Sequence, residues 1–315
     1  MLEYHAAELL AKQPPPIDWL VAGMLPVGTL GDVSGPPGDG KSTILLSLAD
    51  HISRGAAWCE HATRQTAVAW ITGEASSAAA IQRDLHRLKA APDADILFLL
   101  PEGEMFRFDR PAGAWITTAE GAAILQRCRD AGIGFVVIDT IGSVCAGLVE
   151  IDNDQQRQLA RHLRSELAGQ TAICVSHTNQ SSAKDTLDWR LHYLSRAGGN
   201  GFPGAIRWAA GVTALKPDDA VALGERVTRN EIEQARIVAF GISKHNEMPR
   251  PIWNNVAPAV FEIKQDGGLV LLAGGEAVAL HQRQAREAVG FKQKSREDHG
   301  NGNGGKAKAI DPWKL

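Results

Sequence analysis

The sequence predicts an α/β fold, with a mostly parallel sheet flanked by helices and antiparallel strands at its C-terminal end. Between residues 29 and 178, short apolar segments alternate with amphipathic helical segments, which is typical of strand–helix units in a parallel sheet. A glycine-rich loop separates the first of these strands from the first helix. Two apolar segments at 253–263 and 268–272 suggest a terminal antiparallel pair.

Composition and charge narrow the class of protein. The chain has 315 residues, of which 44% are apolar and 22% charged, and this fits one large globular domain with small appendages. No run of 18 apolar residues occurs and the N-terminus lacks an apolar signal segment, so we expect no membrane partner. The net charge of −3 argues against a protein that coats nucleic acid non-specifically, but it leaves room for a locally basic channel.

The cysteines indicate the compartment. Cys59, Cys128, Cys145 and Cys174 are far apart in the sequence and form no C-x-x-C pair. The last three lie in apolar segments, which predicts buried free thiols. Free thiols are typical of a reducing environment, so we expect a cytoplasmic protein.

A phosphate-binding loop follows the first apolar strand, at residues 30–33, and precedes a helix expected from about residue 42 to 55. The loop fits G-x-x-x-x-G-K-[ST], in which glycines let backbone N–H groups approach phosphate oxygens and the helix N-terminus favours the anion. Lys41 would lie between the β- and γ-phosphates, and the Ser42 hydroxyl would bind Mg²⁺. The expected nucleotide-binding set is Gly35, Pro36, Pro37, Gly38, Asp39, Gly40, Lys41, Ser42 and Thr43. A chance match is the alternative, and the strand–loop–helix context argues against it.

Carboxylates end two of the following strands. Residues 67–72 are predicted to form a buried strand that stops at Glu74, which could polarise the water that attacks the γ-phosphate. The alternative for Glu74 is an acid favoured by the dipole of the helix expected over 78–89. An apolar strand over 135–138 ends in Asp139, which is expected to hold Mg²⁺ through water. These motifs in this order predict ATP and Mg²⁺ as cofactors.

The remaining elements follow the same alternation. Residues 96–100 are predicted to be a strand, 104–116 an irregular connection, and 117–131 a helix capped by Thr118. A loop over 142–154, a helix over 155–168 and a strand over 171–178 come next. Ser176, His177 and Asn179 gather at the end of this strand, where they would act as a polar sensor of the γ-phosphate. Ordinary strand-end hydrogen bonding is the alternative.

The segment 180–204 is polar and rich in glycine. Its basic residues Lys184, Arg190 and Arg196 are interleaved with aromatic ones, which favours contacts with the phosphates and bases of nucleic acid. A short surface helix over 186–194 explains the same pattern equally well. Residues 205–215 and 235–244 are predicted to be two further strands, joined by a polar connection.

The chain divides into three parts. A lead-in covers residues 1–34, with a short helix over 3–12 that a run of prolines ends, and we expect it to pack beside the nucleotide site. The ATPase domain spans 14–273. The tail, 274–315, includes a net charge of +4 over 281–315 and a low-complexity stretch that predicts partial disorder. The tail would either contact nucleic acid or serve as a solvated terminus.

The order of these motifs resembles the RecA-like P-loop ATPase core. Within that group the chain is similar to the RepA-type hexameric replicative helicases of plasmids and phages, relatives of the DnaB-type ring helicases. The resemblance covers about residues 14–250 and is carried by PPPIDW, GMLPVGTLGDVSGPPGDGKS, WITGE, FVVIDT, SHTN, SRAGGNG, AIRW and GISKHN. It implies an ATP-dependent DNA helicase that translocates on single-stranded DNA in plasmid or phage replication. It also implies a homohexameric ring with a nucleotide site between neighbouring subunits.

The resemblance implies roles for individual residues. Glu74 would be the catalytic carboxylate and His177 the sensor. Arg207 and Lys244 would reach across the subunit interface to the neighbour's γ-phosphate. The loops after Asp139 and after the sensor would face the central channel, where the basic residues of 180–204 could follow one strand of DNA. A replication initiator or a primase is the candidate protein partner. We do not expect a separate N-terminal domain, so other parts of the chain would make these contacts.

Two departures and several alternatives stay open. Ala75 follows Glu74 where related helicases often have a second acid, and Thr178 stands where a second histidine often follows the sensor. A filament-forming strand-exchange ATPase and a regulatory ATPase or DNA-binding switch share the same core. A GTPase is disfavoured because the chain has no N-K-x-D motif, and a small-molecule kinase would need a lid that no arginine-rich segment provides.

Overall fold

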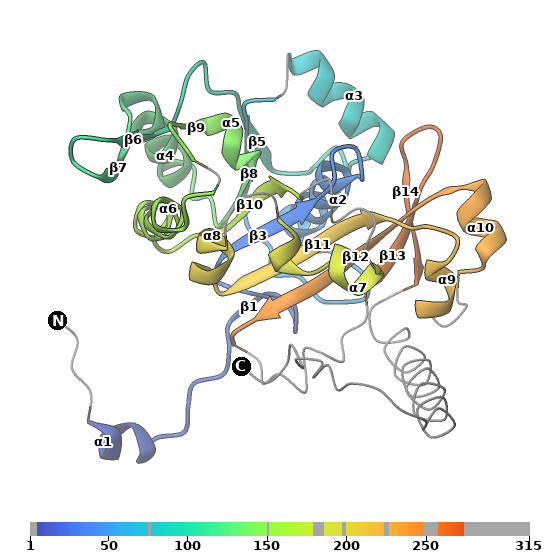
Figure 1. Cartoon of the computed structure of the whole chain (residues 1–315), viewed down its shortest axis with the longest axis horizontal. Coiled ribbons are helices and arrows are strands. Elements are labelled where there is room, and N and C mark those ends of the chain that lie inside the picture. The colour runs from blue at the N-terminus through green and yellow to red at the C-terminus, as the bar shows by residue number, and fades with distance from the viewer. Residues whose placement is uncertain are drawn as a thin grey trace, which may run out of the picture.

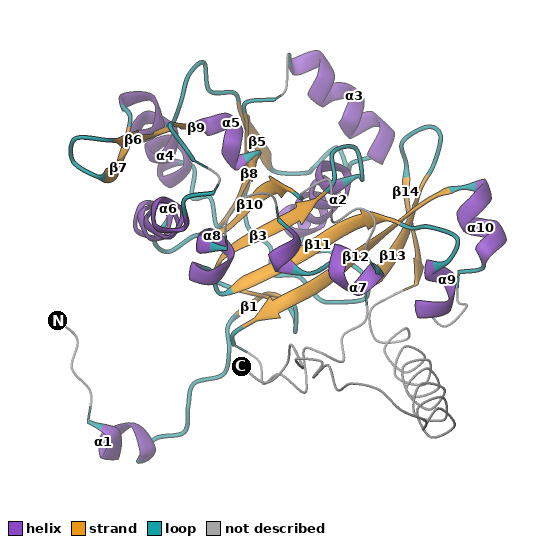
Figure 2. Ribbon diagram, in the orientation of Figure 1, coloured by secondary structure: helices purple, strands orange, loops and turns teal. Residues whose placement is uncertain are grey.

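A nine-stranded sheet with helices on both faces forms the body of the computed structural model (Figures 1 and 2). The structure describes residues 5–74, 77–149, 151–178, 186–196, 200–223, 227–247 and 258–273. The fold is the α/β architecture that the sequence predicts, mostly parallel with antiparallel strands at its C-terminal side. No helix among the described residues has the length and apolar character that crossing a bilayer requires.

The strands of the large sheet come from the whole length of this described region. Their bounds are β3 Leu30–Gly35, β4 Val68–Thr72, β5 Ile96–Leu99, β8 Phe135–Asp139, β10 Thr171–His177, β11 Trp208–Ala214, β12 Arg236–His245, β13 Ala259–Ile263 and β14 Leu269–Ala273. They lie in the order β14-β13-β12-β11-β3-β10-β8-β4-β5. The strands from β11 to β5 run parallel, and β12, β13 and β14 extend the sheet as antiparallel neighbours. The predicted terminal antiparallel pair is therefore confirmed as β13 and β14.

Helices connect these strands. Their bounds are α1 Ala6–Leu10, α2 Lys41–Arg54, α3 Ala78–Leu88, α4 Ala119–Asp130, α5 Ile141–Val144, α6 Asn153–Glu166, α7 Leu187–Arg190, α8 Gly201–Ala205, α9 Asp219–Ala222 and α10 Arg229–Gln234, with a 3-10 helix η2 at Tyr193–Ser195. Thr118 caps α4 as predicted, because its side chain accepts a hydrogen bond from the Gly121 N–H. The short α1 has no buried residue and stands away from the body in Figure 1.

Alternation along the central strands creates two apolar layers. Successive side chains of a strand point to opposite faces, so Val33 and Val137 pack into the layer that α2 covers. Ile138 and Cys174 point the other way, into the layer beneath α4, α5, α6 and α8. A third apolar cluster joins the far end of the sheet to α7, α9 and α10. Burial on both faces explains why these strands are nearly continuous apolar runs.

The segment 104–116 is not the irregular connection that its polar residues predict. It forms a hairpin of β6 Phe106–Asp109 and β7 Ala114–Thr117, and β9 Cys145–Ala146 adds a third strand beside β6. Phe106 and Trp115 are buried against α6, and the Trp115 indole donates a hydrogen bond to the Gln155 carbonyl at 2.9 Å. Four-residue strands with only two buried aromatic side chains carry too short an alternation to be recognised.

The lead-in does not pack beside the nucleotide site as predicted, but at the beginning of β3. It forms a small pair, β1 Trp19–Val21 and β2 Leu25–Pro26. The Trp208 indole donates to the Met24 carbonyl at 2.7 Å, and Trp19 meets the ring of His245 edge-on at 5.6 Å. The chain enters β3 from the lead-in and leaves it through the phosphate loop at the other end. The length of the strand therefore separates the lead-in from the nucleotide site.

The thiols follow the prediction in part. All four cysteines are free, with Cys128 and Cys174 buried and Cys59 and Cys145 half-buried. Burial raises the pKa of the Cys59 thiol to about 12 and that of Cys128 to about 11. The predicted tail, 274–315, lies outside the described residues.

Candidate active site

The phosphate loop and three predicted site residues lie close together because their strands are parallel neighbours. The phosphate loop leaves β3, Glu74 follows β4, Asp139 ends β8 and His177 ends β10. Register places these ends together, since His177 pairs with Gly35 and Thr72 pairs with Asp139. The carboxyl ends of parallel strands are where open α/β sheets bind ligands.

Glycine is required at three points of the loop by geometry. Gly38 and Gly40 have φ of 83° and 90°, in the left-handed region that favours glycine. A Cβ on Gly35 would lie 2.2 Å from the carbonyl oxygen of Val212 on the neighbouring strand. The loop can therefore turn tightly, and α2 starts at Lys41 directly after it. This local structure agrees with the prediction from the motif.

Lys41 is held inside the loop. Its side chain is buried, and Nζ donates to the carbonyls of Gly35 at 2.8 Å and Pro36 at 2.9 Å. Nζ also lies 3.3 Å from Nδ1 of His177. Burial lowers the pKa of Lys41, and the surrounding carboxylates, Asp139 first among them, act in the opposite direction. A bound phosphate chain would add negative charge at this position and so favour the ammonium form.

Ser42 and Asp139 lie side by side at the mouth of the site. The serine side chain is hydrogen-bonded to the Asp139 carboxylate, which is itself buried. Burial raises the pKa of Asp139, and the contact with Ser42 lowers it. A hydroxyl and a carboxylate that share one site fit Mg²⁺, which takes oxygen ligands and is usually bound through one or two protein groups, water and substrate phosphates. Among the described residues, no group of three His, Cys, Asp or Glu forms a metal site by itself.

Glu74 faces its neighbours across the strand ends and does not cap a helix. Its Oε1 accepts a hydrogen bond from the Thr140 hydroxyl at 2.9 Å and lies 4.0 Å from Nε2 of His177. The cap of α3 is Ser77, which accepts from the Ala80 N–H. The reading of Glu74 as a helix N-terminal acid therefore has no support in these contacts. Lys41, His177, Glu74 and the Thr140 hydroxyl form a chain of polar contacts over the ends of β3, β10 and β4.

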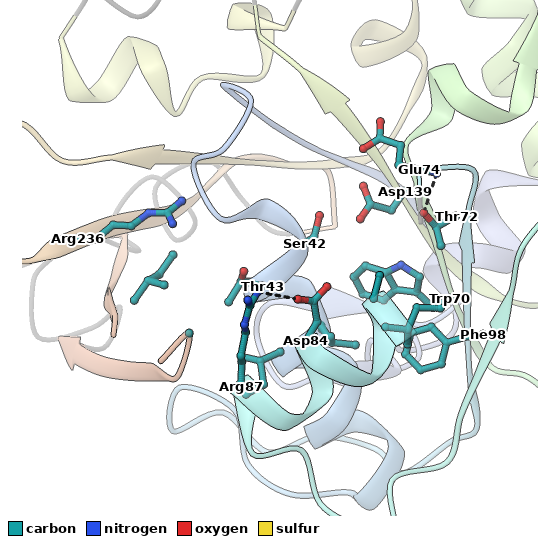
Figure 3. A pocket seen from close by; sticks show the side chains of 16 residues that line it. Ser42, Thr43, Trp70, Thr72, Glu74, Asp84, Arg87, Phe98, Asp139 and Arg236 are labelled. Carbon is teal, nitrogen blue, oxygen red and sulfur yellow. Dashed lines mark hydrogen bonds and ion pairs between the residues drawn. The ribbon is translucent and has the colours of Figure 1, made fainter. Parts of the chain in front are cut away.

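A cavity of about 370 Å³ continues from the phosphate loop toward α3 (Figure 3). Ser42 and Thr43 line it at the loop end, and Trp70 and Phe98 form an apolar wall with their rings 6.4 Å apart. Asp84 on α3 faces Arg87 at 3.4 Å near the opposite side. The cavity thus combines phosphate-binding groups at the loop with apolar side chains farther from it.

Two contacts of the loop with the end of the β11–β12 hairpin could not be found from the sequence. The Asp39 carboxylate accepts from the Ala214 N–H at 2.7 Å, and the Arg236 guanidinium donates to the Gly38 carbonyl. Arg236 lines both the cavity toward α3 and the space above Lys41, so it adds a cation to the site from the same chain. No motif marks Arg236, because it lies almost two hundred residues from the loop.

Arg207 and Lys244 lie toward the amino ends of the parallel strands, opposite to the carboxyl ends where the phosphate loop lies. We call these two sides the two edges of the sheet. Trp208, next to Arg207, pairs with Gly31 at the beginning of β3 and with His245 at the end of β12. At about 3.3 Å per residue, Arg207 is roughly 16 Å along the strand from the level of Gly35. The structure thus does not bring these two cations to the chain's own nucleotide site.

Lys244 donates to the carbonyls of Pro203 at 2.8 Å and Gly204 at 3.3 Å. Burial lowers the pKa of Lys244, and the positive charge of Arg207 lowers it further. An anion placed between the two cations would relieve this repulsion.

Two arginines predicted to meet nucleic acid are internal. Arg190 is buried and paired with the buried Asp219, and it also donates to the Ala214 carbonyl at 2.8 Å. Arg196 is buried with Nε 3.8 Å from the buried Asp32, and its guanidinium lies over the Phe202 ring at 4.6 Å. The expectation that these arginines line a nucleic-acid surface is therefore corrected. Sequence alone cannot separate a basic surface loop from a segment whose cations have buried carboxylate partners.

Arg196 serves instead to anchor the segment after β10. Its backbone pairs with Thr178, whose N–H donates to the Gly35 carbonyl at 3.2 Å. Asp32 also accepts from the Ser176 hydroxyl at 2.9 Å. Burial raises the pKa of Asp32, and Arg196 acts against that shift. The short helix expected over 186–194 exists as α7, with Leu187 and Arg190 buried, and Lys184 and Asn179 lie outside the described residues.

The fold and this arrangement define a P-loop nucleoside triphosphatase core. A family model described as AAA domain (AAA_25) matches residues 2–183, more than half of the chain. The chain belongs to this family and is a P-loop ATPase. The match includes the phosphate loop, Glu74, Asp139 and His177, and it ends before Arg207 and Lys244. A search of curated proteins gave no match.

Proposed function

We propose that this protein is an ATP-dependent helicase or translocase that acts on single-stranded DNA as a ring, in plasmid or phage replication. ATP and Mg²⁺ are the cofactors that the family generally uses and that the site fits. A homohexamer with nucleotide sites between subunits is the proposed assembly. A replication initiator or a primase is the candidate partner.

The observation that carries the proposal is the separation of the catalytic parts between the two edges of the sheet. Lys41, Glu74 and Asp139 lie at one edge, whereas Arg207 and Lys244 lie at the other. A head-to-tail contact between two subunits would bring the second edge of one to the first edge of the next. A cation supplied in this way would stabilise the charge that develops on the phosphoryl oxygens. Hydrolysis would then depend on the geometry of the assembly, as a translocating motor needs.

The groups at the first edge divide the chemistry of hydrolysis among them. Ser42 and Asp139 would hold Mg²⁺, which would supply positive charge against the phosphates. Lys41 leaves the carbonyls of Gly35 and Pro36 to meet the phosphates. Glu74, fixed by the Thr140 hydroxyl, accepts a proton from the attacking water. His177, between Lys41 and Glu74, senses the γ-phosphate and passes its presence to the segment that follows β10.

The test is the steady-state ATPase rate of the purified protein, with and without single-stranded DNA. We expect strong stimulation by DNA, and we expect Lys41→Ala to abolish both the basal and the stimulated rate. Circular dichroism of Lys41→Ala controls for folding. Sedimentation velocity with ATP and Mg²⁺ then reports the size of the assembly.

A rate that requires Lys41 but does not respond to DNA would contradict the helicase proposal and favour a regulatory ATPase. Stimulation by DNA together with assemblies that lengthen as protein concentration rises would favour a filament. The ring and the filament differ in whether the head-to-tail interface closes. Strand displacement on a forked duplex, measured next, separates a helicase from both alternatives.

A further inference from the structure

A groove between α6 and α8 collects basic side chains away from the nucleotide site. It has a volume of about 460 Å³. The two helices lie side by side in the fold (Figure 1). Its lining is Asn153, Arg157, Arg161, Arg164, Asn200, Gly201, Gly204 and Ala205. We call this surface the α6–α8 groove. None of the described residues that line it is acidic, in a chain whose net charge is −3.

The arginines form a row along one helix. Arg157, Arg161 and Arg164 follow one another at spacings of four and three residues, which places them on one face of α6. At about 1.5 Å per residue, the row extends over roughly 10 Å of helix axis. The three side chains are exposed. A row of cations at regular intervals along a groove matches a chain of phosphates better than it matches a single small anion.

Two of the three charges have no carboxylate partner in the described part of the chain. Arg157 pairs with Asp154 at 2.9 Å. Arg164 donates to the Ala205 carbonyl on α8, and no carboxylate of the described residues lies within ion-pair distance of it or of Arg161. Exposed like charges on one helix face repel one another, so such a row destabilises the free protein slightly. A polyanion would remove that cost.

The groove is preformed by close packing of the two helices. A Cβ on Gly201 would lie 2.1 Å from the Asn153 carbonyl oxygen, so only glycine allows α8 to approach the beginning of α6. The Phe202 N–H donates to the Gln156 side chain at 3.2 Å, and Phe202 is fully buried. The positions along α6 from which the arginine side chains extend are therefore fixed by the fold.

The groove opens beside two segments that follow catalytic strands. Asn153 begins α6, after the connection that leaves β8 and Asp139. Asn200 precedes α8, after the segment that leaves β10 and His177. A ligand in the groove would thus contact Asn153 and Asn200, which lie at the ends of these two connections.

We propose that the α6–α8 groove binds the phosphate backbone of single-stranded nucleic acid, with Arg157, Arg161 and Arg164 as its phosphate contacts. The inference rests on the proposed function and specifies where in this chain the strand binds. It replaces Arg190 and Arg196, whose charges are internal. Asn153 and Asn200 add hydrogen-bonding groups for sugar or base edges at the rim.

The test measures the affinity of the full chain for a fluorescently labelled thymidine 30-mer by anisotropy, over a series of salt concentrations. The variant is Arg157→Gln together with Arg161→Gln, which leaves Arg164 and its contact with α8 in place. The slope of log K against log salt is negative, and each phosphate contact on a single strand contributes about −0.7 to it. Because the variant loses two contacts, we expect the magnitude of the slope to decrease by about 1.4. Affinity at low salt should fall by about tenfold or more.

The matched control is Arg127→Gln together with Arg129→Gln, which removes two exposed arginines from α4. The same change of net charge at that place should leave the affinity within about twofold of wild type and the slope unchanged. Basal ATP hydrolysis should be the same in wild type and both variants, since none of the four arginines touches the nucleotide site.

Equal affinity and slope in the α6 variant and the control would overturn the inference while leaving the proposed function standing. An α6 variant that no longer forms the wild-type assembly in sedimentation velocity would also overturn it, since the groove would then be a contact between subunits. A wild-type protein that does not bind the 30-mer would contradict the proposed function and this inference together.

Discussion

The two edges of the central sheet differ in how completely their charged groups are satisfied. At the edge of the phosphate loop, Lys41, His177 and Glu74 contact one another and the adjoining carbonyls and hydroxyls. At the other edge, Arg207 and Lys244 lie near each other, and the contacts of the lysine are neutral carbonyls and the face of a tyrosine ring. At the first edge the charged groups contact one another, whereas at the second no carboxylate of the described residues lies within ion-pair distance of Arg207 or Lys244.

In the proposed assembly, this difference would separate chemistry that one subunit performs from chemistry that needs a second. The connected edge has its phosphate loop, Ser42 and Asp139 in place for a nucleotide. The other edge would gain from an anion that a neighbouring subunit's nucleotide supplies.

Glu74→Gln tests whether the connected edge contains the catalytic base. The amide keeps the shape of the side chain and can still contact the Thr140 hydroxyl, but it cannot take a proton from water. We expect kcat for ATP hydrolysis to fall on the order of 10³-fold, with nucleotide affinity nearly unchanged. Stopped-flow hydrolysis and equilibrium binding of a fluorescent ATP analogue measure the two quantities. A variant that keeps its activity would show that another group activates the water.

Arg207→Ala tests whether the second edge acts on a neighbour. Loss of a cation at the developing charge should lower kcat by about 10²-fold. Arg207→Ala alone should keep only this residual rate and Lys41→Ala alone should be inactive, but a mixture supplies both groups at some interfaces. With random assembly in equal amounts, about a quarter of the interfaces combine an intact Lys41 with an intact Arg207 across the contact. If mixing restores no activity, the arginine does not act between subunits.

Arg236→Ala tests the cation that the chain supplies to its own site. Arg236 lines the cavity and contacts the phosphate loop, but it lies apart from Glu74 and Asp139 on β12. We expect KM for ATP to rise about tenfold with kcat nearly unchanged, the value of one charged hydrogen bond. Arg236→Lys should restore part of the affinity. A fall in kcat with KM unchanged would instead place Arg236 in the chemical step.

Asp139→Asn tests the stability cost of the metal-side carboxylate. Burial raises the pKa of Asp139, so the ionised group destabilises the nucleotide-free native state wherever the pH lies above its native pKa. The variant should therefore melt a few degrees higher than wild type near about pH 8. This gain should shrink as the pH falls through the native pKa and vanish below the ordinary pKa of aspartate, where both states are protonated.

Differential scanning fluorimetry across this pH range, without nucleotide or metal, measures the effect. A gain that is independent of pH would mean that packing of the amide, and not removal of a buried charge, stabilises the variant. Hydrolysis that depends on Mg²⁺ should be lost in the same variant.

Much of the fold followed from local patterns. The apolar runs at 67–72, 96–100, 135–138 and 171–178 became strands of the parallel sheet with small changes at their ends. The phosphate loop was predicted residue by residue, because backbone N–H groups can surround a phosphate only where glycine permits the turn. Glu74, Asp139 and His177 could be grouped in advance, since parallel strands bring their carboxyl ends to one edge.

In contrast, contacts with residues distant in the sequence determine which charged side chains are buried and which are exposed. Arg190 and Arg196 have the composition of a nucleic-acid loop, yet Asp219 and Asp32 hold them in the interior. In the sequence, the arginines of α6 have the pattern of an ordinary solvated helix face. Only the packing of α8 beside α6 places them along a groove. Arg236 belongs to the site only because β12 begins beside the phosphate loop.

Local patterns in the sequence predict the class of protein, the order of its motifs along the chain and the groups that would meet a phosphate. These depend on periodicity and on residue types that are next to one another along the chain. Only the tertiary structure decided which cations are internal, which face outward and which edge of the sheet each one occupies. A charge costs free energy when it is buried without a partner, and the position of that partner is set by the packing of the whole sheet.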